Sequence, residues 1–242
     1  MASPTAHRVA PRVSLSPLHS VSRGADGLGS GESSARRRWR ASRTRVSTLA
    51  TSLPEGYARI GRWDLGRVPR WRIVVLLLLS LASMVAAASV GSAILSLKSG
   101  AASINLDALD LLLGLVLALV LHELTHGVAF LALGARPQFG VKLRTKFGPV
   151  FYASAPGSYL TKSGYLVAGL APALGLTVLL LAIMALAPAG GVAADASYLA
   201  AILNFGGSAG DAMMMRTVLS YPADARFEDT GDGFTVYGPT RV

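Results

Sequence analysis

The feature that most constrains this chain is an apolar run from Leu111 to Leu133, LLLGLVLALVLHELTHGVAFLAL, with three ionisable side chains inside it. About 20 apolar residues cross the hydrocarbon core of a bilayer as a helix. An ionisable group inside such a run is costly, and therefore points to a function. The run predicts a membrane-spanning helix with a functional site at His122, Glu123 and His126.

These three residues form the pattern H-E-x-x-H, which places both histidines on one face of a helix, one turn apart. Two neutral imidazoles can then bind one metal ion, while Glu123 handles a proton of metal-bound water. The same H-E-x-x-H pattern can also occur on a solvated helix face, or where a core histidine is held by hydrogen bonds. However, the chain has only four histidines, and Glu123 is the sole acid between Asp110 and Asp195. The membrane context therefore favours the metal site.

The composition is that of a membrane protein, with 52% hydrophobic and 15% charged residues. There are no cysteines, which excludes disulfides, thiolate metal sites and cysteine nucleophiles, so any metal must be held by His, Asp or Glu. The net charge is +10, but much of it lies in the N-terminal arm and in loops beside apolar runs. That distribution indicates orientation in a membrane rather than a nucleic-acid partner.

Residues 1–52 are predicted to form a disordered basic arm, because they are rich in Ser, Arg and Gly and show no apolar periodicity. The run from Arg36 to Arg40 could also bind nucleic acid or anionic lipid, although an arm that keeps the N-terminus in the cytoplasm is favoured. An organelle transit peptide or a start codon chosen too far upstream would give a similar composition.

The rest of the chain, residues 53–242, is predicted to be one membrane-embedded domain with about four transmembrane helices. The first span is expected at about Ile73–Leu97, and the second is the motif run, which ends at about Leu133. The third is expected at about Tyr165–Ala187 with a kink at Pro172, and the fourth at about Tyr198–Leu219. The fourth span is weaker, because it contains Asn204 and several glycines. Gly206 and Gly210 have the spacing that allows a neighbouring helix to approach closely.

A small β-hairpin is expected between the second and third spans. Apolar residues at 139, 141 and 143 alternate with Lys142 and Arg144, as in a half-exposed strand. Gly148-Pro149 predicts a turn, and Val150–Ala153 a second strand. The DTGDG run at 229–233 predicts another hairpin turn rather than a calcium loop. The fold class is therefore an all-α membrane protein with this small hairpin.

Charge predicts the orientation of the spans. The basic arm places the N-terminus inside, and the loop from Gly134 to Ser163 returns to the inside with five basic residues and no acid. The expected outer loops have Lys98 as their only basic residue. The chain is thus expected to be an integral multi-pass protein of the cell membrane with both termini cytoplasmic, or of an organelle membrane if the arm is a transit peptide.

A catalytic zinc site needs a third protein ligand. The longer pattern H-E-x-x-H-x-x-G-x-x-H is absent, because Ala129 and Ala132 occupy its last two positions. A carboxylate is therefore expected, and Asp211 is the only acid in the fourth apolar run, at a membrane depth similar to that of His122. Pairing of Asp211 with Arg216 is the alternative.

Several motifs resemble the putative zincin peptidase family of small membrane proteins, across about Leu53–Tyr237. They are LPEGY at 53–57, HELTHG at 122–127, GARPQFG at 134–140, YASAP at 152–156, LAP at 170–172, the stretch from Asn204 to Asp211, and the ending EDTGDGFTVY. That family is in turn similar to site-2-type intramembrane metalloproteases.

The resemblance implies Zn²⁺ held by His122, His126 and Asp211, with Glu123 as the catalytic base. In site-2 proteases the aspartate lies in an Asn…Pro…Asp-Gly motif. Asn204 is present here, where the resemblance implies a substrate or oxyanion contact. The prolines are missing and alanine follows the aspartate.

The expected function is that of a zinc-dependent membrane metallopeptidase that hydrolyses peptide bonds in or near the lipid bilayer, with a membrane protein or peptide as substrate. A catalytically inactive metal-binding scaffold and a metal transporter are the alternatives. Glu123 favours the enzyme, because binding alone needs only the ligands. Four spans without a visible internal repeat argue against the transporter. The sequence leaves the oligomeric state open.

Overall fold

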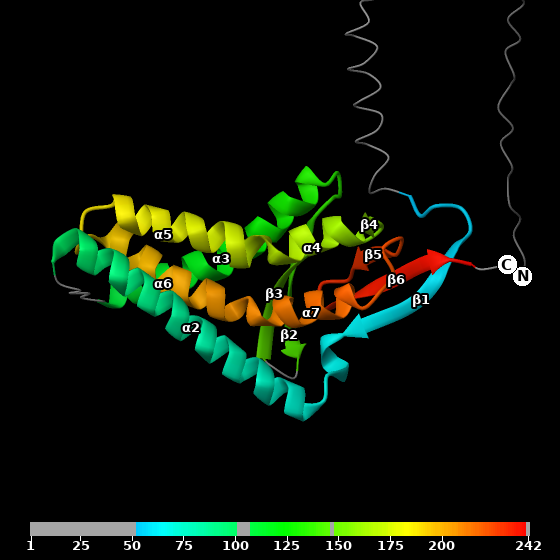
Figure 1. Cartoon of the computed structure of the whole chain (residues 1–242), viewed down its shortest axis with the longest axis horizontal. Coiled ribbons are helices and arrows are strands. Elements are labelled where there is room, and N and C mark those ends of the chain that lie inside the picture. The colour runs from blue at the N-terminus through cyan, green and yellow to red at the C-terminus, as the bar shows by residue number, and fades with distance from the viewer. Residues whose placement is uncertain (1–51, 101–106, 146–147, 241–242) are drawn as a thin grey trace, which may run out of the picture. The chain divides into compact units, whose positions relative to one another are not determined.

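The computed structural model describes residues 52–100, 107–145 and 148–240, whose arrangement is shown in Figure 1. The predicted basic arm, residues 1–52, lies outside these ranges except for its last residue. The described part of the chain is mostly helical, with one four-stranded and one two-stranded antiparallel sheet.

Three helical stretches are long and apolar enough to cross a membrane: α2 (Arg70–Ser99), α3 (Ala108–Ala132) and Lys162–Leu186. The third is built of α4 (Lys162–Ala171), a π-helical turn (Pro172–Leu176) and α5 (Thr177–Leu186). Large apolar side chains on these helices are exposed, including Leu77 and Leu131. Helices of this length with apolar outer faces indicate a membrane protein.

The helix that contains the H-E-x-x-H motif, α3, has a well-defined start. The side chain of Asp107 accepts a hydrogen bond of 2.9 Å from the backbone N–H of Asp110, and the side chain of Asp110 accepts one from the backbone N–H of Asp107. This reciprocal cap satisfies N–H groups that the first turn of a helix cannot pair. The cap sets where α3 begins and thereby the register of its histidines.

The stretch predicted as the fourth span consists of two helices, α6 (Val192–Gly207) and α7 (Ala209–Leu219). They meet at Ser208, directly after two glycines, where helix propensity is low. Neither helix alone, at 16 and 11 residues, has the length of a span. The break gives α7 its own N-terminal turn, which contains Asp211.

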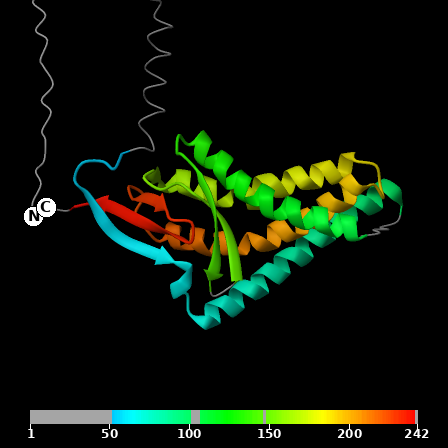
Figure 2. The same ribbon diagram turned by 180° about the vertical axis from the view of Figure 1, so that it is seen from behind.

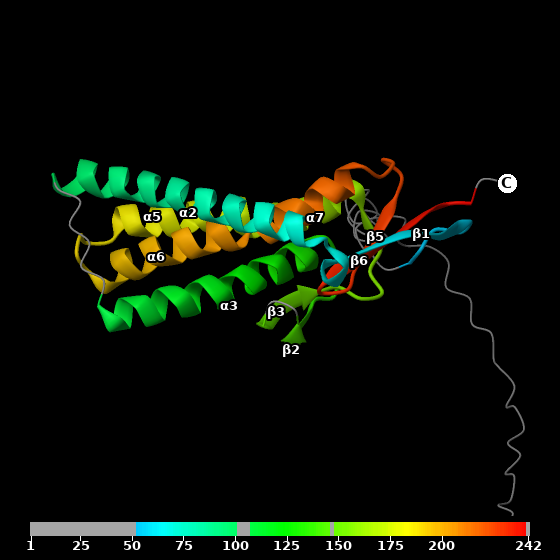
Figure 3. The ribbon, with the colours of Figure 1, turned by 90° about the horizontal axis from the view of Figure 1, so that it is seen from below.

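Helix α6 packs against α2, α3 and α5, and Figure 3 shows it between α2 and α3. Small residues allow this close packing. Gly91 of α2 lies against the ring of Tyr198, and Gly114 of α3 lies against Leu199, so that a β-carbon at either glycine would clash. As a result, α6 and α3 are held close enough for their side chains to share a site.

The four-stranded sheet lies at one end of the helices (Figure 1) and has the strand order β1-β6-β5-β4. Its strands are β1 (Tyr57–Asp64), β4 (Leu160–Thr161), β5 (Arg226–Asp229) and β6 (Gly233–Pro239). Phe227, Phe234 and Val236 are fully buried and pack with Tyr165 of α4. Strand β1, which the sequence did not predict, joins the start of the domain to its C-terminal strand.

The two-stranded sheet pairs β2 (Gln138–Thr145) with β3 (Gly148–Ser154), with Val141 opposite Phe151. Figure 2 shows this hairpin leaving the end of α3 and running across the helices. The ring of Phe139 fills the space over Gly127 of α3, which ties the hairpin to the motif helix. Gly148 and Pro149 both belong to β3, so the turn predicted at Gly148-Pro149 is wrong.

Candidate metal centre

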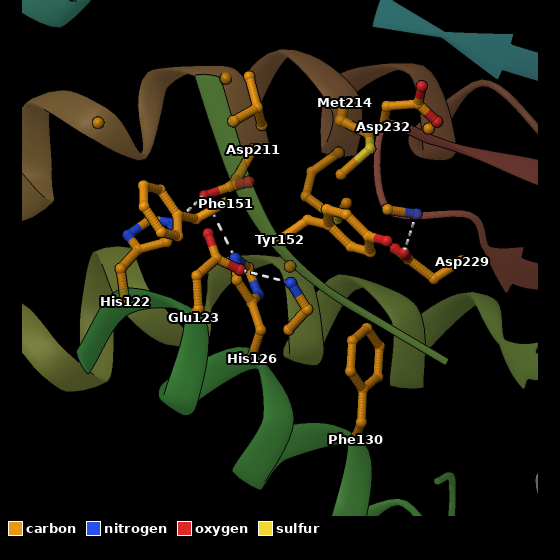
Figure 4. Close-up of a pocket in the computed structure, with 18 of the residues that line it drawn as sticks. His122, Glu123, His126, Phe130, Phe151, Tyr152, Asp211, Met214, Asp229 and Asp232 are labelled. Carbon is orange, nitrogen blue, oxygen red and sulfur yellow. Dashed lines mark hydrogen bonds and ion pairs between the residues drawn. The ribbon is translucent and has the colours of Figure 1, made fainter. Parts of the chain in front are cut away.

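The two histidines of α3 meet a carboxylate from α7. His122 and His126 lie one helical turn apart, with ring centroids 5.0 Å from each other. The Oδ2 atom of Asp211 is 3.2 Å from Nε2 of His122 and 3.6 Å from Nε2 of His126. The three ligand atoms all lie within 4.8 Å of one another (Figure 4). This is the spacing of side chains that share one metal ion.

Hydrogen bonds at the other ring nitrogens set the tautomers of both imidazoles. Nδ1 of His126 is 2.8 Å from the backbone oxygen of Ala168, which can only accept a hydrogen bond. Nδ1 of His122 is 3.0 Å from the side-chain oxygen of Asn204. Both Nδ1 atoms therefore carry a proton, so in the neutral imidazoles the lone pairs of both Nε2 atoms are directed at Asp211.

The amide of Asn204 is itself held in one orientation. Its Nδ2 donates hydrogen bonds of 2.8 Å to the backbone oxygen of Pro172 and to Oγ1 of Thr177, in and beside the π-helical turn. These bonds identify the nitrogen, so the remaining oxygen faces His122. The side chain is only 1% exposed. The substrate contact suggested for Asn204 stays a prediction; in the structure, its amide orients a histidine.

The chemistry of this group fits a divalent metal ion. Oδ2 of Asp211 is buried and has no hydrogen-bond donor, although it faces two imidazole lone pairs. Three acceptor atoms turned toward one point are stable when a cation lies between them. Two imidazole nitrogens and one carboxylate oxygen, with a fourth side open, form a ligand set that zinc uses in catalytic sites. Among the described residues, Asp211 lies next to these two histidines and forms no ion pair with Arg216.

Glu123 lies beside this group and is held by the hairpin. Its Oε2 accepts a hydrogen bond of 2.6 Å from the backbone N–H of Ala153, near the end of β3. Among the described residues, no protein group donates a hydrogen bond to Oε1, and the carboxylate lies beside the two histidines (Figure 4). One edge of β3 pairs with β2, and its Ala153 N–H is directed at the acid of the motif.

Two cavities border the centre. One, of about 220 Å³, extends from the three candidate metal ligands to the β5–β6 turn and is walled by aromatic and methionine side chains that include Trp63, Tyr165 and Met214. The other, of about 350 Å³, runs between α3 and α6 and is lined by apolar residues such as Leu115 and Leu203. His122, Glu123 and β3 residues border both cavities. The two cavities therefore meet beside the candidate metal centre.

The sequence analysis did not identify Asp229 as a site residue, yet it lines the first cavity. Its Oδ2 accepts a hydrogen bond of 2.6 Å from the hydroxyl of Tyr165, and its Oδ1 accepts one of 2.8 Å from the backbone N–H of Gly231. Burial raises the pKa of the Asp229 carboxyl to about 6, although both hydrogen bonds act in the opposite direction. The only local signal was the DTGDG run, which indicated a turn and gave no hint of its neighbours.

A comparison with known protein families agrees with this geometry. Residues 115–226 match a family model described as "Putative zincin peptidase". The matched range includes the H-E-x-x-H motif, Asn204 and Asp211, and bears out the resemblance drawn from the motifs. No curated protein and no solved structure matched the chain.

Proposed function

We propose, from the match to the zincin peptidase family, that this chain is a zinc-dependent metallopeptidase that hydrolyses peptide bonds of membrane proteins or peptides in or near the bilayer. The observation that carries the proposal is the meeting of Asp211 with both histidines of a membrane-length helix, beside Glu123. A ligand set alone would serve storage or transport. The adjoining carboxylate and open cavities favour hydrolysis.

His122, His126 and Asp211 would hold the zinc ion. When bound, zinc polarises the scissile carbonyl and lowers the pKa of a water molecule to about 7. Glu123 accepts a proton from the attacking water molecule as the water oxygen bonds to the carbonyl carbon. The same carboxyl then donates that proton to the amine nitrogen as the C–N bond breaks. The hydrogen bond from Ala153 keeps the carboxylate in place through both transfers.

The hairpin supplies a surface for an extended substrate. A transmembrane segment must unwind before its peptide bonds are accessible, and an unpaired strand edge can bind extended chain through backbone hydrogen bonds. Strand β3 contacts α3 and borders both cavities next to Glu123. A substrate paired with β3 would therefore pass directly in front of the catalytic carboxylate.

The sheet supports four membrane crossings. Strand β1 precedes α2, while β6 follows α7, and the two are antiparallel neighbours. Likewise β4, which precedes α4, pairs with β5. The chain thus returns to the same side after each pair of helices, so α6 and α7 together supply the fourth crossing. The basic loop after α3 supports a cytoplasmic location for this side, and hence a multi-pass protein of the cell membrane with both ends inside.

The test compares the purified protein with its Glu123→Gln variant. Zinc is measured in both, and peptides released from membranes are identified by mass spectrometry in cells that carry each form. We expect equal zinc content and peptides that appear with the unaltered protein alone. Zinc in both forms with no difference in peptides would instead support a binding scaffold, and zinc flux into vesicles would support a transporter.

A further inference from the structure

The two cavities beside the metal centre differ in chemistry. The space between α3 and α6 is lined mainly by apolar side chains, which suits the membrane part of a substrate. The space toward the β5–β6 turn combines apolar walls, including Trp63 and Phe130, with a carboxylate from Asp229. A chain that passes the metal centre from one cavity to the other would therefore move from an apolar to an acidic environment.

Asp229 lacks a counter-charge. The residue is 6% exposed, and both of its oxygens accept hydrogen bonds from neutral donors, the hydroxyl of Tyr165 and the backbone N–H of Gly231. Among the described residues, no Lys, Arg or His forms an ion pair with it. An ionised carboxylate in such a place is stabilised by a cation that enters the cavity.

The wall next to Asp229 already receives one lysine of the chain. Lys142 of β2 places its Nζ atom 5.2 Å from the ring centroid of Tyr152 and 2.9 Å from Oδ2 of Asp232. Both Tyr152 and Asp232 line the same cavity as Asp229. An ammonium group between an aromatic ring and a carboxylate is therefore compatible with this surface.

We propose that this cavity is a specificity subsite for a lysine or arginine side chain of the substrate, with Asp229 as the residue that selects the charge. The inference rests on the proposed peptidase function. The aliphatic stem of the substrate's lysine or arginine would pack on the aromatic and methionine walls, and the charged head of that side chain would reach Asp229.

Membrane topology supplies such a residue at the right place. Segments that span a membrane carry Lys and Arg at their cytoplasmic ends. The β5–β6 turn belongs to the sheet that lies on the cytoplasmic side in the orientation proposed above. The substrate class is thus the cytoplasmic end of a transmembrane segment, with its apolar part between α3 and α6 and its first basic residue beside Asp229.

The test uses the zinc-loaded Glu123→Gln protein in detergent, so that binding is measured without cleavage. The probes are fluorescent peptides with a leucine-alanine segment, followed by a lysine placed at successive positions, and matched peptides with norleucine instead. At one position or more, we expect the lysine peptide to bind about tenfold more tightly or better, because a charged hydrogen bond replaces an apolar contact. A second substitution, Asp229→Asn, should remove that preference and leave norleucine binding unchanged.

Asparagine has the shape of aspartate: its oxygen can still accept from the Gly231 N–H and its nitrogen can donate to the Tyr165 hydroxyl oxygen, so the change removes the charge and reverses one hydrogen bond. Asp224→Asn, at an exposed position, is the matched control and should keep the preference. Equal binding of lysine and norleucine peptides at every position, or a preference that survives Asp229→Asn, would overturn the subsite. The peptide comparison keeps Asp229 in place, so it decides the question even if Asp229→Asn does not fold. The zinc content and the peptide release of the Glu123→Gln variant, compared with the unaltered protein, test the proposed function instead.

Discussion

Asn204 on α6 holds His122 on α3 through a hydrogen bond of 3.0 Å between its side-chain oxygen and Nδ1 of the imidazole. The bond connects two helices that are 82 residues apart in sequence at this point. Because Asn204 is fixed in turn by Thr177 and Pro172, three segments of the bundle determine where one ring nitrogen points. Such outer contacts influence metal affinity nearly as much as the ligands do.

Replacing Asn204 with alanine should therefore lower zinc affinity by about 10- to 100-fold, because His122 loses the partner that fixes its tautomer. The measurement is a zinc competition titration with a chelator of known affinity. Ser80→Ala is the matched control, since Ser80 donates a hydrogen bond of 2.8 Å to the backbone of Gly206 on the same helix without touching a histidine. Equal zinc affinity in both variants would contradict the positioning role.

Asp211→Ala should reduce zinc occupancy sharply, because the site loses a charge and a coordination bond together. Asp211→Asn should also lose affinity, since a neutral amide is a poorer ligand. Metal analysis of the purified variants measures both effects. Asp224→Ala removes an exposed acid and should leave zinc bound. Full occupancy in Asp211→Ala would mean that the third ligand is another group.

Glu123→Gln should keep zinc and reduce turnover by at least about 100-fold, since glutamine preserves the shape but cannot accept a proton. Its amide can also reorient, because the N–H of Ala153 still needs an acceptor. Release of labelled peptide from a membrane substrate measures turnover. Activity close to that of the unaltered protein would remove Glu123 from the role of base.

Proline at Val141 should weaken cleavage while leaving zinc content unchanged. It disturbs the pairing of β2 with β3 opposite Phe151, and so the strand edge that would hold an extended substrate. Val192→Pro is the control, because the first position of α6 tolerates proline. Cleavage rate and zinc content are measured together. Unchanged cleavage in Val141→Pro would show that the hairpin does not present the substrate.

Asp229 should make stability depend on pH. Its folded pKa, about 6, lies above its ordinary value of 3.8, so the folded state holds the proton more tightly than the unfolded chain. The stability gained from this proton is complete below about pH 4 and is lost as pH rises through 6. Relative to Asp229→Asn, the unaltered protein should lose up to about 3 kcal/mol over that window. Thermal unfolding in detergent at pH 4 to 7 measures the difference, and parallel curves for both proteins would contradict it.

Local sequence was enough for the features that depend on neighbouring residues. The H-E-x-x-H spacing alone places His122 and His126 on one face of a helix, because a turn has 3.6 residues. The apolar runs of α2 and α3 identify membrane helices by length. The expectation that Asp211 lies near the histidines needed only the shortage of other acids in the membrane and a count of helical rise.

Tertiary structure decided everything that depends on distant contacts. The amide of Asn204 orients His122 only because α6 packs on α3, and no local pattern predicts which way an amide points. Strand β1 forms by pairing with β6 at the other end of the domain, so its own residues carried no signal of it. The sequence indicated a turn at Asp229. In the structure this residue lines the cavity, because the sheet folds back over α4 and α7. Helix periodicity depends on residues that are close in sequence, so the sequence alone predicts it. The side chains that meet in a site come from distant elements, and their packing is determined only in the folded chain.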